Sequence, residues 1–212
     1  MKKKIVILGS TGSIGQNTLK IIKKDKKNFE IILLSTNKNI TRVINQAKKF
    51  NVKNIIINDF KKYLEAKYKI RNKNIKIYNN FDEIDKILKF KKVYYSMIAV
   101  SGLEGLKPTL KLTQYSKNLA VANKESLICG WCLIKKKLKK YKTNFIPLDS
   151  EHFSIFSLLN SNKTNLIDKI YITASGGPFI NFPKKNFIKI KPKDALKHPN
   201  WKMGKKITVD SA

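Results

Sequence analysis

The sequence predicts an α/β protein: a Rossmann-like, doubly wound parallel sheet followed by the start of an α+β domain. Short apolar runs rich in isoleucine and valine alternate with longer amphipathic stretches, a glycine-rich turn follows the first run, and the pattern changes after Pro147. Strand, helix and strand at this spacing are typical of βαβ units, which assemble parallel sheets. We therefore expect one sheet domain over 1–147 and a second domain over 148–212.

Seven strands are expected in the first domain, because strands covered on both faces are nearly continuous apolar runs. They cover 4–8, 30–35, 54–57, 75–78, 93–99, 119–122 and 144–147. Stretches with apolar residues three or four apart predict helices between them, at 14–24, 40–50, 60–68, 81–90, 106–113 and 126–140. Beyond Pro147, a strand-like run at 168–173 precedes a glycine turn and a stretch at 184–193. No closing element follows, so we expect the second domain to be incomplete.

The net charge of +31 arises from 45 lysine and arginine residues against 14 aspartate and glutamate residues. Only Arg42 and Arg71 are arginine, and lysine is spread through nearly every segment. Nucleic-acid surfaces cluster their charge and favour arginine, so we expect no specific nucleic-acid partner. No apolar run approaches the roughly 20 residues of a membrane span, and no export signal is visible. With only two cysteines, we expect a cytoplasmic protein that does not act at a membrane.

The turn after the first strand, Gly9–Gly15, reads GSTGSIG and opens the next helix. Glycines permit a tight turn, and the helix N-terminus offers N–H groups and a positive dipole to a pyrophosphate. NAD sites usually place an acidic residue at the end of the second strand. This chain has Asn37, Lys38 and Asn39 there, which favours NADPH. The alternatives are a plain glycine turn and an ordinary surface lysine.

Two acidic or amide-rich motifs follow later strands. Asn123, Lys124 and Glu125 come after the strand at 119–122, at the edge where open α/β sheets bind ligands. Ordinary helix capping is the alternative there. Asp149 and Glu151 would share one face if the chain were extended, and their carboxylates suit Mg²⁺ or Mn²⁺. The alternative for this pair is the acidic first turn of a helix.

Three other segments contain residues that could take part in chemistry. The turn at 173–179 has the form of an anion-cradling loop. The loop at 198–205 combines histidine, tryptophan and lysine, which suits a mobile lid, with a plain surface loop as the alternative. Cys129 and Cys132 have CxxC spacing, but two cysteines cannot complete a four-cysteine metal site. Buried thiols acting as small apolar groups are the better interpretation.

Taken in order, the motifs GSTGSIG, ANKESL, LDSEH, TASGGPF and HPNWKMGKKITVDSA resemble the 1-deoxy-D-xylulose 5-phosphate reductoisomerase family, from Ile5 to Ala212. The resemblance implies an enzyme of non-mevalonate isoprenoid biosynthesis. Such an enzyme uses NADPH and a divalent metal, Mg²⁺, Mn²⁺ or Co²⁺, to convert the phosphosugar 1-deoxy-D-xylulose 5-phosphate to 2-C-methyl-D-erythritol 4-phosphate. The full-length form is expected to be a homodimer.

The resemblance also implies roles for individual residues. NADPH would be bound by Thr11, Gly12, Ser13, Ile14, Asn37, Lys38, Asn39, Asn123 and Glu125. The expected catalytic residues are Lys124 and the two metal ligands, Asp149 and Glu151. The substrate would be bound by Lys124, Ser150, Glu151, Ser175, His198 and Ser211, under a lid that contains Trp201 and Met203.

The family continues past the VDSA motif at 209–212 with a segment that supplies a third metal-ligating glutamate. This chain alone is therefore expected to bind NADPH without catalysing the reaction. Two alternatives stay open. One is another NADP-dependent Rossmann oxidoreductase, against which the DSEH and HPNW motifs argue. The other is a non-catalytic remnant or split-gene fragment that binds only NADPH.

Overall fold

The computed structural model describes residues 2–69, 74–89, 91–161, 167–172, 176–200 and 204–211. The chain divides into two compact units, Met1–Asn162 and Lys163–Ala212. Helix α7 (Ser150–Ser161) belongs to the first unit and contacts the last strand of its sheet. The unit boundary therefore lies one helix beyond the domain boundary predicted after Pro147, and that domain division stays a prediction.

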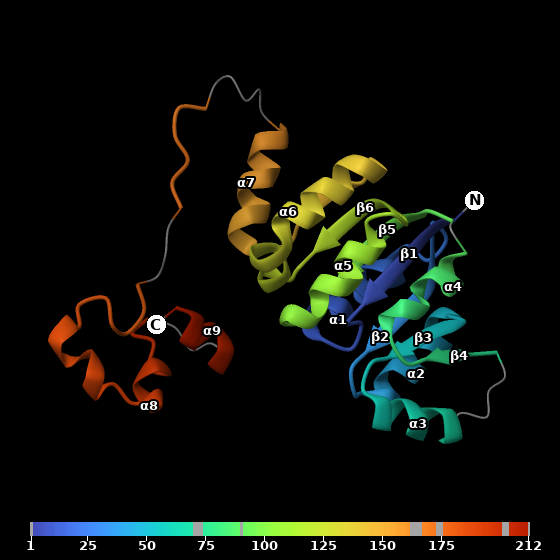
Figure 1. The fold of residues 1–212 in the computed structure, drawn as a ribbon, viewed down its shortest axis with the longest axis horizontal. Coiled ribbons are helices and arrows are strands. Elements are labelled where there is room, and N and C mark those ends of the chain that lie inside the picture. Colours follow the sequence, from blue (N-terminus) through green and yellow to red (C-terminus); the bar gives the residue numbers. More distant parts are fainter. Residues whose placement is uncertain are drawn as a thin grey trace. The chain divides into compact units, whose positions relative to one another are not determined.

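The first unit is a sheet of seven parallel strands flanked by helices (Figure 1). The order across the sheet is β4-β3-β2-β1-β5-β6-β7, and neighbouring strands pair in parallel. This order reverses between β1 and β5, which confirms the predicted doubly wound fold. The strands are β1 (Lys3–Leu8), β2 (Phe29–Thr36), β3 (Asn54–Ile57), β4 (Lys76–Tyr78), β5 (Val93–Ile98), β6 (Ser116–Val121) and β7 (Asn144–Pro147).

Each strand is followed by a helix, and two of these helices begin with a 3-10 turn. They are α1 (Ser13–Lys24), α2 (Ile40–Phe50), α3 (Phe60–Lys69), η1 (Phe81–Glu83) with α4 (Ile84–Leu88), η2 (Leu103–Gly105) with α5 (Leu106–Leu112), α6 (Lys124–Tyr141) and α7. The helix predicted over 81–90 ends at Leu88 because Lys89 adopts a left-handed φ of 47°. The helix predicted over 126–140 begins two residues earlier because Asn123 caps it.

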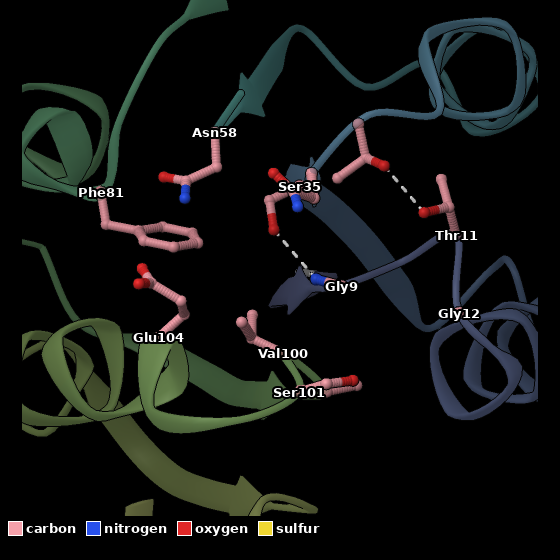
Figure 2. Close-up of a pocket in the computed structure, with 12 residues that line it drawn as sticks. Gly9, Thr11, Gly12, Ser35, Asn58, Phe81, Val100, Ser101 and Glu104 are labelled. Atoms are coloured by element: carbon pink, nitrogen blue, oxygen red, sulfur yellow. Dashed lines mark hydrogen bonds between the residues drawn. The ribbon is translucent and has the colours of Figure 1, made fainter. Parts of the chain in front are cut away.

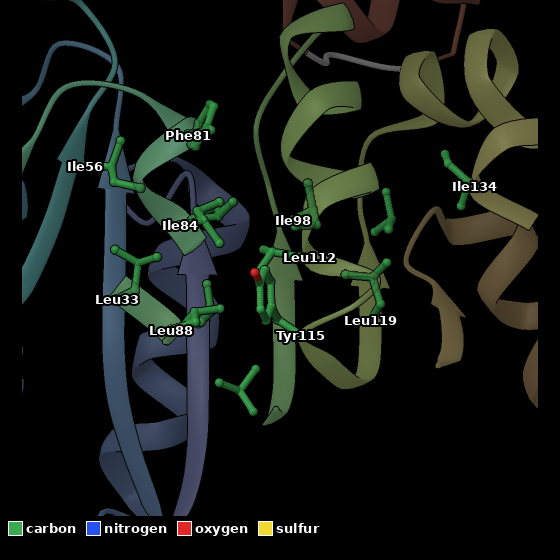
Figure 3. Close-up of a cluster of buried hydrophobic side chains, with 14 of the residues drawn as sticks. Leu33, Ile56, Phe81, Ile84, Leu88, Ile98, Leu112, Tyr115, Leu119 and Ile134 are labelled. Atoms are coloured by element: carbon green, nitrogen blue, oxygen red, sulfur yellow. The ribbon is translucent and has the colours of Figure 1, made fainter. Parts of the chain in front are cut away.

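Alternate residues of the central strands point into two cores, one on each face of the sheet. Val6 and Leu8 pack with α4, α5 and α6, and Figure 3 shows this core with Ile84, Leu112 and Ile134. The neighbouring side chains of β1 face the other way, into the core that α1, α2 and α3 cover. Because helices cover both faces, the strands consist of apolar runs rather than an alternating pattern.

The second unit consists of short helical segments and irregular chain in its described residues. The segments are η4 (Lys184–Lys189), α8 (Pro192–Ala195) and α9 (Lys205–Asp210). Residues 167–172 form no strand, which corrects the strand predicted over 168–173; Thr173 itself lies outside the described residues. A strand needs a paired neighbour, and the described part of this unit contains none. Ile170 and Ile172 are accordingly 53% and 73% exposed.

None of the described helices combines the length and the apolar character that a membrane span requires.

Candidate functional site

A pocket of about 260 Å³ lies at the carboxyl end of the sheet, around the point where the strand order reverses. Figure 2 shows Phe81 pointing into it between Asn58 and Glu104. Loops that follow adjacent strands diverge at such a reversal, and open α/β sheets bind their ligands there. The pocket is lined by Gly9, Thr11, Gly12, Ser35, Thr36, Asn37, Asn58, Phe81, Ala99, Val100, Ser101 and Glu104.

The three glycines of the turn after β1 are there for different reasons. Gly9 has a φ of 77°, and a Cβ atom on it would lie 2.2 Å from the carbonyl oxygen of Ala99. A Cβ atom on Gly15 would lie 2.4 Å from the carbonyl oxygen of Gly9. Gly12 has an ordinary φ of −76°, and its nearest neighbour would be 3.5 Å away. Packing within the protein therefore requires glycine at positions 9 and 15, whereas Gly12 lines the pocket and has no close neighbour at its Cβ position.

The N-terminus of α1 lies beside this pocket. Gly12 is its capping residue, so no side chain accepts from the first turn, and that turn contains no acidic residue. The first N–H groups of a helix have no acceptor within the helix, and the helix dipole adds partial positive charge. Ser13 and Ile14 begin the helix and are exposed. This donor set, together with the space at Gly12, fits a phosphate group of a dinucleotide.

The loop after β2 places the three residues predicted for the 2′-phosphate in different surroundings. Asn37 lines the pocket, and Asn39 caps α2 by accepting from the Arg42 N–H at 3.1 Å. Lys38 is 69% exposed, with its Nζ 3.8 Å from an oxygen of Asp59. The sequence did not reveal this acid, which comes from the end of neighbouring β3. An ion pair this exposed contributes little, so a phosphate can compete for the lysine.

Asn123 lies at the start of α6 and is hydrogen-bonded to the loop after β5, which forms one wall of the pocket. Its side chain is 2% exposed, and its Oδ1 accepts from the Ser126 N–H at 2.8 Å. Its Nδ2 donates to the carbonyl oxygens of Val100 and Gly102 in the loop after β5. The capping alternative is thus correct for this residue, and its contact with a cofactor remains a prediction. Lys124 and Glu125, whose roles stay predictions too, occupy the first turn of α6.

Asp149 and Glu151 do not lie on an extended chain. Ser150 begins α7, so Glu151 occupies its first turn, which corrects the two-apart geometry and supports the helical alternative. Nδ1 of His152 lies 2.8 Å from Oδ1 of Asp149. Burial raises the pKa of Asp149, but hydrogen bonds to His152 and Glu151 and the charge of His152 outweigh burial, so this pKa lies below its usual value.

The described residues supply only part of the ligand set that the predicted metal site would need. Carboxylate oxygens are suitable donors for a hard divalent cation. Within the described ranges, however, no cluster of three or more histidine, cysteine, aspartate or glutamate side chains could hold a metal ion. Asp149 and Glu151 are therefore a partial ligand set, and their role stays a prediction.

The predicted substrate residues of the second unit are described in part. Nδ1 of His198 accepts from the Asn200 N–H at 3.1 Å, and Oγ of Ser211 donates to the Thr208 carbonyl oxygen at 2.9 Å. Ser175, Trp201 and Met203 lie outside the described residues, and only the backbone of Ser150 is described.

The two cysteines are exposed, which corrects the prediction that they are buried. Helix α6 packs through residues four apart, Ser126, Gly130, Ile134 and Leu138. A Cβ atom on Gly130 would lie 2.3 Å from a methyl carbon of Leu106, so this stripe is in close contact with α5. Cys129 and Cys132 lie outside the stripe.

Sequence reasoning missed the far wall of the pocket. Asn58, Phe81 and Glu104 follow β3, β4 and β5 respectively, and only the strand order brings them together. It also missed Arg42 and Gln46 on α2, which bind the turn after β1. One signal was available for Arg42, because it is one of only two arginines in a lysine-rich chain.

Comparisons with known proteins identify the family of this chain. A family model described as 1-deoxy-D-xylulose 5-phosphate reductoisomerase matches residues 5–130. The model of the C-terminal domain of the same enzyme matches residues 145–212. A reductoisomerase of Pelagibacter ubique is 60% identical over 211 residues, covering 99% of this chain and 54% of the relative. One from Clostridium kluyveri is 39% identical over 99% of this chain and 55% of its own length.

Solved structures of such enzymes are similar over the same region. The enzyme of Zymomonas mobilis in complex with NADPH has a TM-score of 0.86 and 31% identity, and the match covers 100% of this chain and 54% of that one. A DOX-P reductoisomerase in complex with NADPH, fosmidomycin and magnesium has a TM-score of 0.80 and 31% identity, over 99% and 54% of the two chains. The chain thus spans about half the length of the curated relatives it matches.

Proposed function

Because the chain belongs to the 1-deoxy-D-xylulose 5-phosphate reductoisomerase family, we propose that its sheet is the NADPH-binding part of an NADPH-dependent reductoisomerase. The enzyme would convert 1-deoxy-D-xylulose 5-phosphate to 2-C-methyl-D-erythritol 4-phosphate. The observation that carries this proposal is the pocket at the strand reversal, which is open at Gly12 and adjoins the uncapped N-terminus of α1. Solved relatives in complex with NADPH support it.

The residues of this chain divide the binding of NADPH between two loops. Thr11, Gly12, Ser13 and Ile14 would hold the pyrophosphate, with the backbone N–H groups at the start of α1 as donors, since the start of a helix stabilises negative charge. Lys38 and Asn39 would meet the 2′-phosphate at the carboxyl end of β2, with Asn37 beside them. Asn123 and Glu125 would border the cofactor from the start of α6. Bound NADPH supplies the hydride that reduces the rearranged substrate.

For the catalytic part, we propose Asp149 and Glu151 as two ligands of a divalent metal, Mg²⁺, Mn²⁺ or Co²⁺. Such an ion would polarise substrate oxygens as a Lewis acid. The phosphosugar would contact Lys124, Ser150, Glu151, Ser175, His198 and Ser211, with Trp201 and Met203 in the lid. We further propose that the full-length enzyme is a cytoplasmic homodimer.

A titration of the chain with NADPH and with NADH tests the cofactor proposal. We expect NADPH to bind more tightly, and Lys38→Ala to weaken NADPH by roughly 1.5–3 kcal/mol, the value of one charge-assisted contact. NADH should be nearly unaffected by the substitution. The control is Lys135→Ala, which removes an exposed lysine from α6 and should change neither affinity. Equal or tighter binding of NADH would overturn the assignment.

Turnover tests the metal proposal separately. The chain alone should not oxidise NADPH in the presence of 1-deoxy-D-xylulose 5-phosphate and Mn²⁺, because two carboxylates bind a hard cation weakly. In a complete enzyme, Asp149→Asn should abolish turnover and leave NADPH affinity nearly unchanged. Steady oxidation by the chain alone, or full activity of that variant, would remove both carboxylates from the mechanism.

A further inference from the structure

We propose that Gln46 and Arg42, on one face of α2, are positioning residues that hold the turn after β1, residues 9–12, in its phosphate-binding form. The proposal rests on the function proposed above and extends it to side chains that would not touch the cofactor themselves. Residues four apart on a helix lie on the same face, and this face of α2 is turned toward the turn.

Gln46 forms two hydrogen bonds with Ser10, a residue of the turn. Its Nε2 donates to the carbonyl oxygen of Ser10 at 2.8 Å, and its Oε1 accepts from the hydroxyl of Ser10 at 2.7 Å. Ser10 is fully buried, and its own N–H donates to the Ser35 carbonyl oxygen at 2.9 Å. The position of Ser10 is therefore determined by β2 on one side and by α2 on the other.

The next carbonyl oxygen of the turn is also bound from outside. Nη1 of Arg42 donates to the Thr11 carbonyl oxygen at 3.2 Å, and Nε2 of Gln16 donates to the same oxygen at 3.0 Å. Two consecutive carbonyl groups of the turn are thus fixed by side chains of α1 and α2.

The geometry of the peptide bond explains how these contacts would affect phosphate binding. In a trans peptide the C=O and the following N–H point in opposite directions. Fixing the carbonyl of Ser10 on Gln46 therefore directs the N–H of Thr11 away from α2. A carbonyl oxygen directed toward a bound phosphate would repel it. By binding the carbonyl oxygens of Ser10 and Thr11, Gln46 and Arg42 would keep these oxygens directed away from the phosphate.

Helix α2 also links the two phosphate subsites. Its capping residue, Asn39, follows Lys38 at the predicted 2′-phosphate position, and one turn later Arg42 reaches the turn after β1. Arg42 is one of only two arginines in the chain, and the planar guanidinium offers directed donors that a lysine ammonium lacks. Since Gln46 is half-buried and Arg42 is exposed, Gln46 should have the larger effect.

The test compares two ligands, NADPH and adenosine 2′-monophosphate, which has the 2′-phosphate but no pyrophosphate. Gln46→Met keeps the length of the side chain and removes both contacts. We expect it to weaken NADPH about tenfold and adenosine 2′-monophosphate less than twofold. Arg42→Lys keeps the charge and should weaken NADPH about threefold. Asn45→Met, at an exposed neighbouring position of α2, is the matched control and should change neither affinity.

The outcomes separate the two proposals. If the unaltered chain does not bind NADPH, the proposed function fails. If it binds, and Gln46→Met leaves NADPH affinity unchanged or weakens both ligands equally, the positioning role is overturned, because a general loss of structure would act on both. Should Gln46→Met not fold, Arg42→Lys decides by the same ratio of the two affinities.

Discussion

The pockets at the two ends of the parallel sheet differ in the charge of the residues that line them. The pocket at the carboxyl end is lined mainly by glycine, serine, threonine, asparagine and apolar residues, and Glu104 is the one charged residue among them. The pocket at the amino end, of about 560 Å³, is lined by six lysines, Lys2, Lys3, Lys4, Lys89, Lys91 and Lys92. The end that we propose for a polyanionic cofactor is thus the one whose lining contains no lysine.

This difference teaches that positive charge does not mark the binding site in a chain of this composition. Backbone N–H groups of a fixed turn impose a geometry on a phosphate, whereas a lysine on a flexible stem does not. At the amino end, Lys3 lies over the Tyr94 ring at 4.6 Å, and Lys92 donates to the Tyr141 carbonyl oxygen at 2.6 Å. We interpret the amino end as a source of stability and the carboxyl end as the site of binding.

The largest effect is expected at Gly9. Gly9→Ala should lower the free energy of unfolding by roughly 3 kcal/mol, because left-handed strain of about 1–2 kcal/mol adds to a clash with the end of β5. Urea unfolding measures this loss. Gly102→Ala is the control, since Gly102 has a similar φ of 70° but nothing within 4 Å of the added Cβ. A loss no greater than that of the control would contradict the close-packing argument.

The next effect concerns the amino end, where Tyr115 precedes β6. Burial, followed by a hydrogen bond to Asp85, raises the pKa of Tyr115 to about 12. The unfolded chain ionises this phenol near pH 10, so the stabilisation is complete below pH 10 and is lost as the pH rises toward 12. The loss should amount to about 2–3 kcal/mol.

Denaturant unfolding at several pH values from 9 to 12 measures this dependence. Tyr115→Phe should remove that part of the alkaline loss and leave NADPH affinity unchanged, as expected of a residue outside the pocket. An alkaline slope identical in the two proteins would show that ionisation of other groups accounts for it.

Gly12→Ala tests the comparison through its effect on NADPH binding rather than on stability. The protein has room for the methyl group, so stability should change by no more than about 0.5 kcal/mol. NADPH should bind about tenfold more weakly, or about 1.4 kcal/mol, because Gly12 lines the pocket and a methyl group there would take up space next to the proposed pyrophosphate. Thermal unfolding and a fluorescence titration on one sample measure both quantities. Unchanged NADPH affinity would place the pyrophosphate elsewhere.

The smallest effect is expected from the lysines of the amino end. Replacing Lys2, Lys4 and Lys91 together by glutamine should change NADPH affinity less than about twofold at 0.15 M salt, where charges are screened beyond about 8 Å. The titration used for Lys38→Ala serves here too, with that variant as the positive control. A large loss of affinity would mean that overall charge contributes to binding, and the contrast between the two ends would fail.

The sheet was predictable because its strands are apolar on both sides and the breaks between them are polar. The strands over 54–57 and 144–147 and the helix over 40–50 have the predicted bounds. The far wall of the pocket was not predictable, since Asn58, Phe81 and Glu104 converge only through strand order. The alternation of strands and helices predicted a doubly wound sheet, but it did not indicate which loop residues would meet at the reversal.

Two errors have local causes. The segment with Asp149 and Glu151 follows a strand closely, and the change from strand to helix takes place within two residues. Apolar character alone does not mark that boundary. The exposure of Cys129 depends on which face of α6 meets α5, and the close contact at Gly130 decides this.

Strand β1 is synthesised before the other strands of its sheet, yet it lies in the interior of the sheet between β2 and β5. Its partner β2 leaves the ribosome soon afterwards, but β5 begins only at Val93. Until then one edge of β1 has no strand to pair with, and unpaired apolar edges promote aggregation in nascent chains. We expect ribosome-bound chains that end before Val93 to recruit more chaperone than chains that extend past Pro147. The position of β1 thus makes the interval between the synthesis of β2 and that of β5 the vulnerable stage in the formation of this sheet.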